Sequence, residues 1–187
     1  MNIFILDSNP TSAAKQMCDK HVVKMIIESG QMLSTAHRVL DGDEYYDLSR
    51  NGRRIKRWRL ADDRENFLYK ASFMNHPCTR WTMETKSNYH WHTRHALSLC
   101  IEYTARYGKI HKAQPLIEFL DDTLPENIPD RDVQTPFPQA MPEEYKNKCA
   151  VTAYRAYYLG EKKRFAKWKN TETPSWFLTG DPEYCMI

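Results

Sequence analysis

Apolar and polar residues alternate with a helical period along most of this chain. Between Asp19 and Leu40, apolar residues recur at steps of three or four, which predicts a long amphipathic helix. Asn9-Pro10 predicts the start of an earlier helix, because proline is well tolerated at the first helical position. The apolar residues 3–6 in front of it predict a short strand or an extended lead-in.

The remaining pattern predicts more helices, separated by prolines and glycines. Pro77 begins a helix that runs in one or two pieces to Tyr107, with Gly108 as its C-cap. Other helices are expected at residues 64–71, 113–120 and 148–167. Three segments are expected to lack helix: 41–63 as an exposed loop or hairpin, 121–142 as a proline-rich surface loop, and 170–187 as an irregular tail.

These elements predict an all-α (mainly α) fold, with a compact single helical domain, long loops and little or no sheet. The domain is expected to span residues 1–177, with 41–63 as an exposed basic insertion and 178–187 as a C-terminal tail.

Composition agrees with a globular chain and argues against a membrane protein. The 187 residues are 41% hydrophobic and 12% aromatic, which is enough to build a core. No apolar run reaches the roughly 18 residues that a membrane span needs, and the N-terminus lacks the basic region of a secretory signal. Five scattered cysteines without a CxxC pair predict reduced thiols and a cytoplasmic protein, which could associate with the nucleoid.

The net charge of +3 is mild, but basic residues cluster with aromatic ones. Such mixtures suit a phosphate backbone and unstacked bases, although a solvated surface has the same composition. The first cluster holds Arg50, Arg53, Arg54, Lys56, Arg57 and Arg59 around Trp58, and the second holds Lys162, Lys163, Arg164, Lys167 and Lys169 with Phe165 and Trp168.

The long early helix carries a polar stripe. His21, Lys24, Glu28 and Gln31 follow each other at steps of three or four, which places them on one face. A proton-transfer group flanked by cations suits chemistry on a phosphate-bearing substrate, and a plain solvated helix face would look the same.

Two further segments are candidates for phosphate contacts. Asn75-His76-Pro77 lies at a helix start, with Arg80 one turn later, and could bind an anion or serve only as a helix start capped by Asn75. Arg106, Lys109 and Lys112 lie near a helix C-terminus, where they could form a basic rim for nucleic acid or simply complement the helix dipole.

Other chemistries find little support. His92 and His95 are three residues apart, but no HExxH pattern accompanies them, and no metal site is expected. The chain has no GxSxG elbow, P-loop or GxGxxG motif, so no cofactor is expected.

The early helix carries Asp19, His21 and, seven residues after His21, Glu28. Three later segments follow along the chain: Glu102–Gly108, Pro142–Lys146 ahead of a basic helix, and Pro174-Ser175-Trp176-Phe177. In this order, which is kept over most of residues 1–177, the motifs resemble those of the pyrimidine-dimer DNA glycosylase/abasic-site lyases of the endonuclease V type.

The resemblance implies a helical, DNA-binding domain in which an N-terminal amine attacks the sugar C1′ and forms an imine. It gives Glu28 the acid/base role and makes His21, Lys20 and Lys24 contacts to phosphate or sugar. It also places His21 among the catalytic residues, Asp19 among the substrate-binding ones and Trp176 near the lesion. In the family, removal of the initiator methionine exposes a small residue. Position 2 here is Asn2, so the amine would be that of Met1 or of Asn2.

Two alternatives remain open at this stage. A hydrolase acting on a modified base or nucleotide could use Glu28 to activate water without any amine, with His21 and Asn75 or His76 holding the substrate. A non-catalytic nucleic-acid or nucleotide-binding protein would show the same basic residues. The sequence predicts no oligomeric state.

Overall fold

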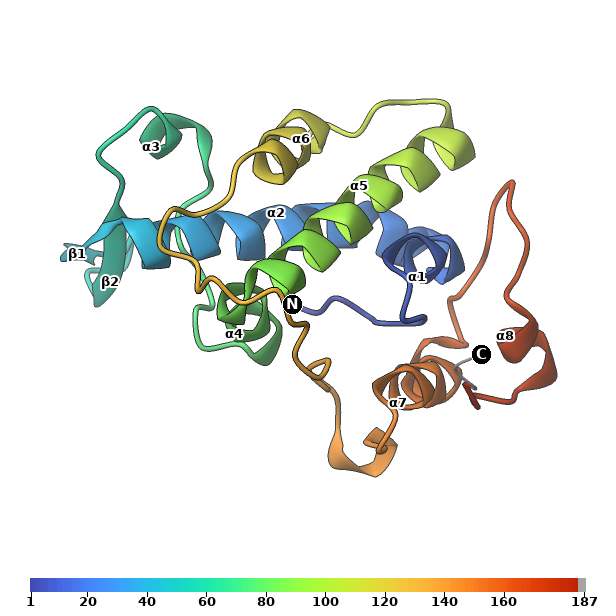
Figure 1. The fold of residues 1–187 in the computed structure, drawn as a ribbon. Helices are drawn as coiled ribbons and strands as arrows, with labels where there is room; N and C mark the ends of the chain where they lie inside the picture. Colours follow the sequence, from blue (N-terminus) through green and yellow to red (C-terminus); the bar gives the residue numbers. More distant parts are fainter. Residues whose placement is uncertain (185–187) are drawn as a thin grey trace.

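The computed structural model describes residues 1–184 and shows a mainly helical fold (Figure 1). This confirms the expected fold class, since these residues contain a single sheet of two strands. The α-helices are α1 (Pro10–Gln16), α2 (Asp19–Asp41), α3 (Arg64–Phe67), α4 (Pro77–Glu84), α5 (Lys86–Tyr107), α6 (Gln114–Asp122), α7 (Ala150–Tyr157) and α8 (Ser175–Thr179). The strands are β1 (Asp43–Leu48) and β2 (Arg54–Arg59), a 3-10 turn covers Glu143–Tyr145, and a π-helical turn covers Tyr158–Lys162.

The two longest helices, α2 and α5, cross at the centre of the fold, and α6 packs against both (Figure 1). Gly30 lies where α2 meets α6. A Cβ at this position would lie 3.3 Å from the side chains of both Leu116 and Tyr69, so glycine permits the close approach. Gly108 ends α5 in the left-handed conformation, with φ of 65°, as expected for its C-cap.

The predictions for the first half of the chain are largely confirmed. Pro10 is the first residue of α1, and the side chain of Asn9 accepts hydrogen bonds from the backbone N–H groups of Thr11 and Ser12. Helix α2 matches its predicted range to within one residue, and the helix expected from Pro77 to Tyr107 forms in two pieces. Residues 3–6 form neither a strand nor a fully extended lead-in, because Phe4 has a left-handed backbone conformation.

Two helices are shorter than predicted. Helix α3 ends at Phe67, because the carbonyl groups of Leu68 and Tyr69 accept hydrogen bonds from buried Arg38 instead of continuing the helix. Helix α7 is followed by the π-helical turn rather than by a regular helix to residue 167. In that turn a Cβ at Gly160 would overlap the hydroxyl of Tyr145, so a larger residue there would displace the Tyr145 ring.

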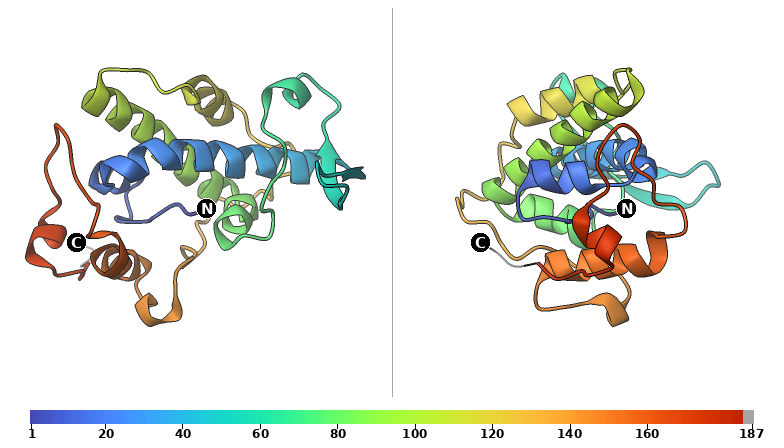
Figure 2. Two further views of the ribbon diagram at one scale, coloured as in Figure 1. Left: turned by 180° about the vertical axis from the view of Figure 1, so that it is seen from behind. Right: turned by 90° about the vertical axis from the view of Figure 1, so that its right-hand side faces the viewer.

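Residues 41–63 contain a β-hairpin, one of the two forms expected. Strands β1 and β2 pair antiparallel from Asp43 opposite Arg59 to Leu48 opposite Arg54. Figure 2 shows the hairpin extending from the end of α2, away from the helices. Its base is held by Arg38, which donates to the carbonyl of Trp58 at 3.1 Å and forms an ion pair with Glu65.

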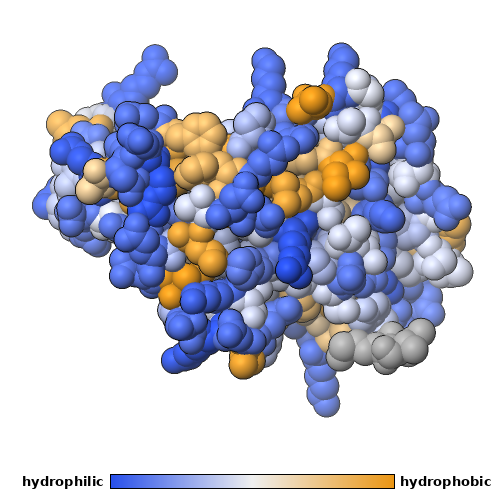
Figure 3. All heavy atoms as spheres, turned by 45° about the horizontal axis from the view of Figure 1, so that its top comes forward, coloured by the Kyte–Doolittle hydropathy of each residue, from blue (hydrophilic) through white to orange (hydrophobic). Residues whose placement is uncertain are grey.

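The surface of the described chain has apolar as well as charged regions. Figure 3 shows apolar side chains between hydrophilic ones on the face that contains α5 and α6. Within residues 1–184, no helix has both the length and the apolar character that crossing a membrane would require. Cys18, Cys78, Cys100 and Cys149 are free thiols, and Cys185 lies outside the described residues.

The protein should lose stability in mild acid, because four of its histidines are buried. Burial is the main reason why the pKa of His21, His92 and His95 is lowered to about 3 and that of His37 to about 4. The unfolded chain therefore takes up protons below pH 6.5 that the folded protein refuses until about pH 4. The free energy of unfolding should fall as the pH drops through this range, by up to about 1.4 kcal/mol per pH unit for each histidine.

Urea unfolding at pH 7.5, 6 and 5 would measure this slope. His95→Phe removes one of these protonation sites and should flatten the slope by up to about 1.4 kcal/mol per pH unit. A free energy of unfolding that stays constant between pH 7.5 and 5 would contradict the prediction.

Candidate active site

The first residues of the chain bring the α-amine against α2. Ile3, Ile5 and Leu6 are fully buried, which holds this N-terminal segment in place. Phe4 has a φ of 55°, a left-handed conformation that is rare for a bulky residue, and its ring stacks on His21 at 4.3 Å between ring centroids. Such a conformation costs about 1–3 kcal/mol and persists only where packing enforces it. The chain end therefore has a defined direction, which leads to Glu28.

Glu28 is 8% exposed and lies between two nitrogen groups of the chain end and a lysine. Its Oε2 accepts a hydrogen bond from the backbone N–H of Asn2 at 2.9 Å, and the α-amine of Met1 lies 3.8 Å from the same oxygen. Its Oε1 lies 3.1 Å from Nζ of Lys24, whose side chain is 67% exposed. The structure thus brings Met1, Asn2, Lys24 and Glu28 together.

Asn2 anchors the chain end. The side chain donates from Nδ2 to the carbonyl of Ala140 at 2.7 Å, and Oδ1 accepts from the backbone N–H groups of Ile3 and Phe4. With 7% exposure and both ends of its side chain bound, Asn2 holds its own backbone nitrogen next to Glu28. Either α-amine is therefore within reach of the carboxylate, that of Met1 as the chain stands or that of Asn2 after removal of Met1.

The pKa of His76 is affected by the same two charges, those of the α-amine and Glu28. Burial is the first cause that lowers its pKa, and the positive α-amine lowers it further while Glu28 opposes the shift. Nδ1 accepts a hydrogen bond from the backbone N–H of Cys78, so the proton of the neutral ring is on Nε2. His76, and not Asn75, is thus the N-cap of α4.

His21 has a different place from the one expected of a catalytic or phosphate-binding group. It is 6% exposed, its Nδ1 contacts the hydroxyl of Tyr158, and its ring lies beside Phe4 and Phe165. The low pKa keeps this ring neutral at physiological pH. The environment of His21 is that of a group that supports the N-terminal segment.

Arg106 also differs from the expectation of a contact with nucleic acid, because it is 1% exposed. Its guanidinium forms ion pairs with Asp19 and Glu102, both at 3.0 Å, and donates to the carbonyls of Met17 and Lys15. These contacts use all of its N–H groups within the protein. Asp19 also accepts from the backbone N–H of Lys169, so this network joins α1, α2, α5 and the C-terminal segment.

The other predicted cations are at the surface. Lys20 is exposed and lies over the ring of Phe165 at 5.0 Å, which places the second basic cluster beside the start of α2. Exposed Asn75 and Arg80 line a cavity of about 330 Å³ beside α4. Exposed Lys109 and Lys112 line another of about 410 Å³, together with Ile27, Tyr69 and Tyr103.

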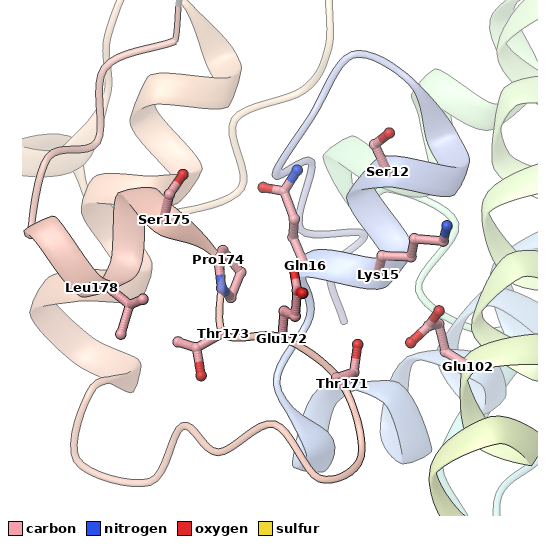
Figure 4. A pocket seen from close by; sticks show the side chains of 10 residues that line it. All are labelled: Ser12, Lys15, Gln16, Glu102, Thr171, Glu172, Thr173, Pro174, Ser175 and Leu178. Atoms are coloured by element: carbon pink, nitrogen blue, oxygen red, sulfur yellow. The ribbon is translucent and has the colours of Figure 1, made fainter.

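Trp176 is 6% exposed, and its Nε1 donates to Gln16 at 2.6 Å. Gln16 lines a polar cavity of about 580 Å³, between α1 and the C-terminal segment (Figure 4). The other lining residues are Ser12, Lys15, Glu102, Thr171, Glu172, Thr173, Pro174, Ser175 and Leu178. Trp176 thus lies behind one wall of this cavity, which is lined by neither Glu28 nor the first two residues.

Sequence reasoning missed three groups around the site. The carbonyl of Ala140 holds Asn2, the hydroxyl of Tyr158 contacts His21, and the charge of Lys162 contributes to the low pKa of His21. Each of them is more than 130 positions away along the chain from the group it affects. No local pattern could have paired them.

The fold and the site together define a mainly helical protein in which a chain-terminal amine and a buried glutamate meet beside exposed lysines. A family model described as pyrimidine dimer DNA glycosylase matches residues 1–115, more than half of the chain, and the chain belongs to this family. Membership confirms the resemblance found in the sequence and implies a DNA glycosylase of the repair type, with DNA as its substrate. Searches of curated proteins and of solved structures give no match.

Proposed function

We propose that this protein is a DNA glycosylase with abasic-site lyase activity, in which the N-terminal α-amine is the nucleophile and Glu28 the acid/base group. The observation that carries the proposal is the contact of Glu28 with the chain end. Oε2 lies 2.9 Å from the nitrogen of Asn2 and 3.8 Å from that of Met1. These distances leave both groups within reach of one sugar.

The chemistry follows from the properties of an α-amine. Its reference pKa of about 8 gives it a far larger neutral fraction at physiological pH than a lysine has, and only the neutral amine attacks. The nitrogen bonds to C1′ of the sugar as the nucleobase leaves with the electrons of the glycosidic bond and takes up a proton from solvent. Glu28 accepts the proton that the attached nitrogen loses and gives it to the ring oxygen as the C1′–O4′ bond breaks and the sugar opens to the imine. A general base then removes a C2′ proton, and elimination breaks the C3′–O bond and releases the 3′ phosphate.

The groups around this pair suit a phosphodiester substrate. Lys24 pairs with Glu28 and is largely open to solvent, and Lys20 lies one helical turn away on the same face. His76 offers a neutral Nε2–H donor near the amine. We assign phosphate or sugar contacts to these side chains and to Asn75 and Arg80, and more distant backbone contacts to Lys109 and Lys112.

Borohydride trapping tests the proposed nucleophile. Incubation with duplex DNA that contains an abasic site should give a covalent adduct after reduction, because borohydride converts an imine into a stable amine. Peptide mapping should place the adduct on the nitrogen of Met1 or of Asn2, and intact mass shows which residue begins the purified chain.

The control is selective acetylation of the α-amine near neutral pH, where lysines with a pKa of about 10.4 stay protonated. Acetylation should abolish the adduct, whereas Lys24→Met should still form it. An acetylated protein that still removes bases would indicate hydrolysis with water as the nucleophile. An adduct on a lysine would place the nucleophile elsewhere.

A further inference from the structure

The β-hairpin formed by residues 43–59 carries a net positive charge that has no role in the proposed catalytic site. It contains six basic residues (Arg50, Arg53, Arg54, Lys56, Arg57 and Arg59) and three acidic ones (Asp43, Glu44 and Asp47). The whole chain has 27 basic and 24 acidic residues, so the hairpin accounts for the net charge of +3 and the rest of the chain is balanced. This concentration of charge on one projecting element favours a polyanionic partner.

The arrangement of side chains on the hairpin suits such a partner. Arg50 and Arg53 are exposed at its tip, where Gly52 makes the turn with a φ of 72°. On one face, Arg54 stacks on the ring of Tyr46 at 3.6 Å, and Tyr46 is 53% exposed. A two-stranded ribbon fits the major groove of B-form DNA, which is about 12 Å wide.

The base of the hairpin is rigid. In addition to the hydrogen bond from Arg38 to Trp58, Arg57 donates to the carbonyl of Ala71 at 3.1 Å. Trp58 is 8% exposed, and the backbone N–H of Leu60 donates to Glu65. A ribbon that is already positioned loses little conformational freedom on binding, so its contacts contribute to affinity with a small ordering cost.

The hairpin has a defined position relative to Glu28. It follows α2 directly, and Gly42 is fourteen residues beyond Glu28, which corresponds to about 21 Å along the helix axis. At about 3.4 Å per base pair, this is about six base pairs of duplex. Figure 2 (left) shows α2 crossing the molecule with the hairpin at one end and the C-terminal segment at the other.

Basic residues therefore lie along one line. Lys20 and the cluster around Phe165 are at the start of α2, the amine and Glu28 lie beside its middle, and the hairpin follows its end. We call the base pairs on either side of the reacting nucleotide the two arms of the duplex. A straight duplex that presents one nucleotide to Glu28 and follows α2 would reach the hairpin with one arm only.

We propose that the hairpin is a second DNA-binding element, which holds the duplex about six base pairs to one side of the reacting nucleotide. This proposal rests on the proposed function for the identity of the ligand. It assigns to the ribbon a task that the catalytic site does not perform, the selection of one arm of the substrate.

The test measures equilibrium binding of the full chain to duplexes that contain a stable abasic-site analogue, so that no chemistry is needed. One duplex has two long arms. In each of two other duplexes, one arm is trimmed to about three base pairs, which is shorter than the roughly six base pairs that separate Glu28 from the hairpin. Wild-type protein should lose affinity when one particular arm is trimmed, and much less when the other is. The double variant Arg50→Ser/Arg53→Ser should bind the long duplex about tenfold more weakly and should not respond to trimming of that arm.

The salt dependence supplies a second readout. Each lost phosphate contact should reduce the slope of log Kobs against log salt by about 0.9, so the double variant should lose roughly two units of slope. Arg94→Ser/Arg131→Ser removes the same charge from exposed positions on α5 and in the 123–142 segment, and should keep the response to arm length. Thermal unfolding of each variant checks that the fold is retained.

Either of two results would overturn the proposal. If the hairpin variant binds all duplexes with wild-type affinity and slope, the ribbon serves another partner, such as a protein. If hairpin and control variants lose affinity equally on every duplex, the effect is one of net charge. Neither result depends on imine trapping, so a failure here is separate from a failure of the proposed reaction.

Discussion

The variant Glu28→Gln should lose about 10²–10⁴-fold in the rate of base removal and strand cleavage under single-turnover conditions, because an amide cannot transfer the proton that opens the sugar. The substitution keeps the shape of the side chain. The carbonyl oxygen of the new amide can still accept the hydrogen bond from the nitrogen of Asn2, so the N-terminal segment should remain in place.

The measurement is a single-turnover assay on duplexes that contain a pyrimidine dimer or an abasic site, accompanied by DNA affinity and thermal unfolding. Affinity for DNA should be unchanged or slightly higher, because a negative charge near the phosphates is removed. Glu118→Gln on α6, at an exposed position, is the matched control and should keep full activity. If Glu28→Gln cleaves at the wild-type rate, Glu28 has no acid/base role.

The variant Arg106→Met should destabilise the fold by about 3–5 kcal/mol, because Asp19 and Glu102 would be left without their buried partner. For a chain of this size, the melting temperature should fall by on the order of 10 °C. Since the network joins α1 to α2, whose side chains hold the N-terminal segment, activity should fall together with the folded fraction.

Lys109→Met is the matched control, three residues further on and exposed, and should change stability by less than about 0.5 kcal/mol. The pair of variants also separates two roles for Arg106. If Arg106→Met is stable but binds DNA more weakly, Arg106 contacts nucleic acid, as its sequence position indicated.

The helices could be predicted where local signals and packing agree. Proline and asparagine mark the start of α1, glycine marks the end of α5, and the apolar spacing of α2 is regular. The prediction failed after Phe67, where Arg38 takes the backbone carbonyls that a longer helix would use. Arg38 is some thirty positions earlier in the chain, so its effect has no local signature.

The candidate site, too, could be predicted only where its signals are local. The spacing of Lys24 and Glu28 on one helix face is a local property, and their ion pair could be foreseen from it. The burial of Arg106 could not, because a cation near a helix C-terminus is usually exposed, and its carboxylate partner Asp19 is 87 positions away.

By itself, the sequence determined the helical class, the polar stripe with Glu28, the basic clusters and, through the order of its motifs, the family. Each of these depends on residue type and spacing within a few helical turns. Tertiary structure alone decided which polar side chains are available, burying His21 and Arg106 and leaving Lys20 and Lys24 open. It also brought the nitrogens of Met1 and Asn2 to Glu28, because that contact depends on Phe4 packing against His21 and on Ala140 holding Asn2.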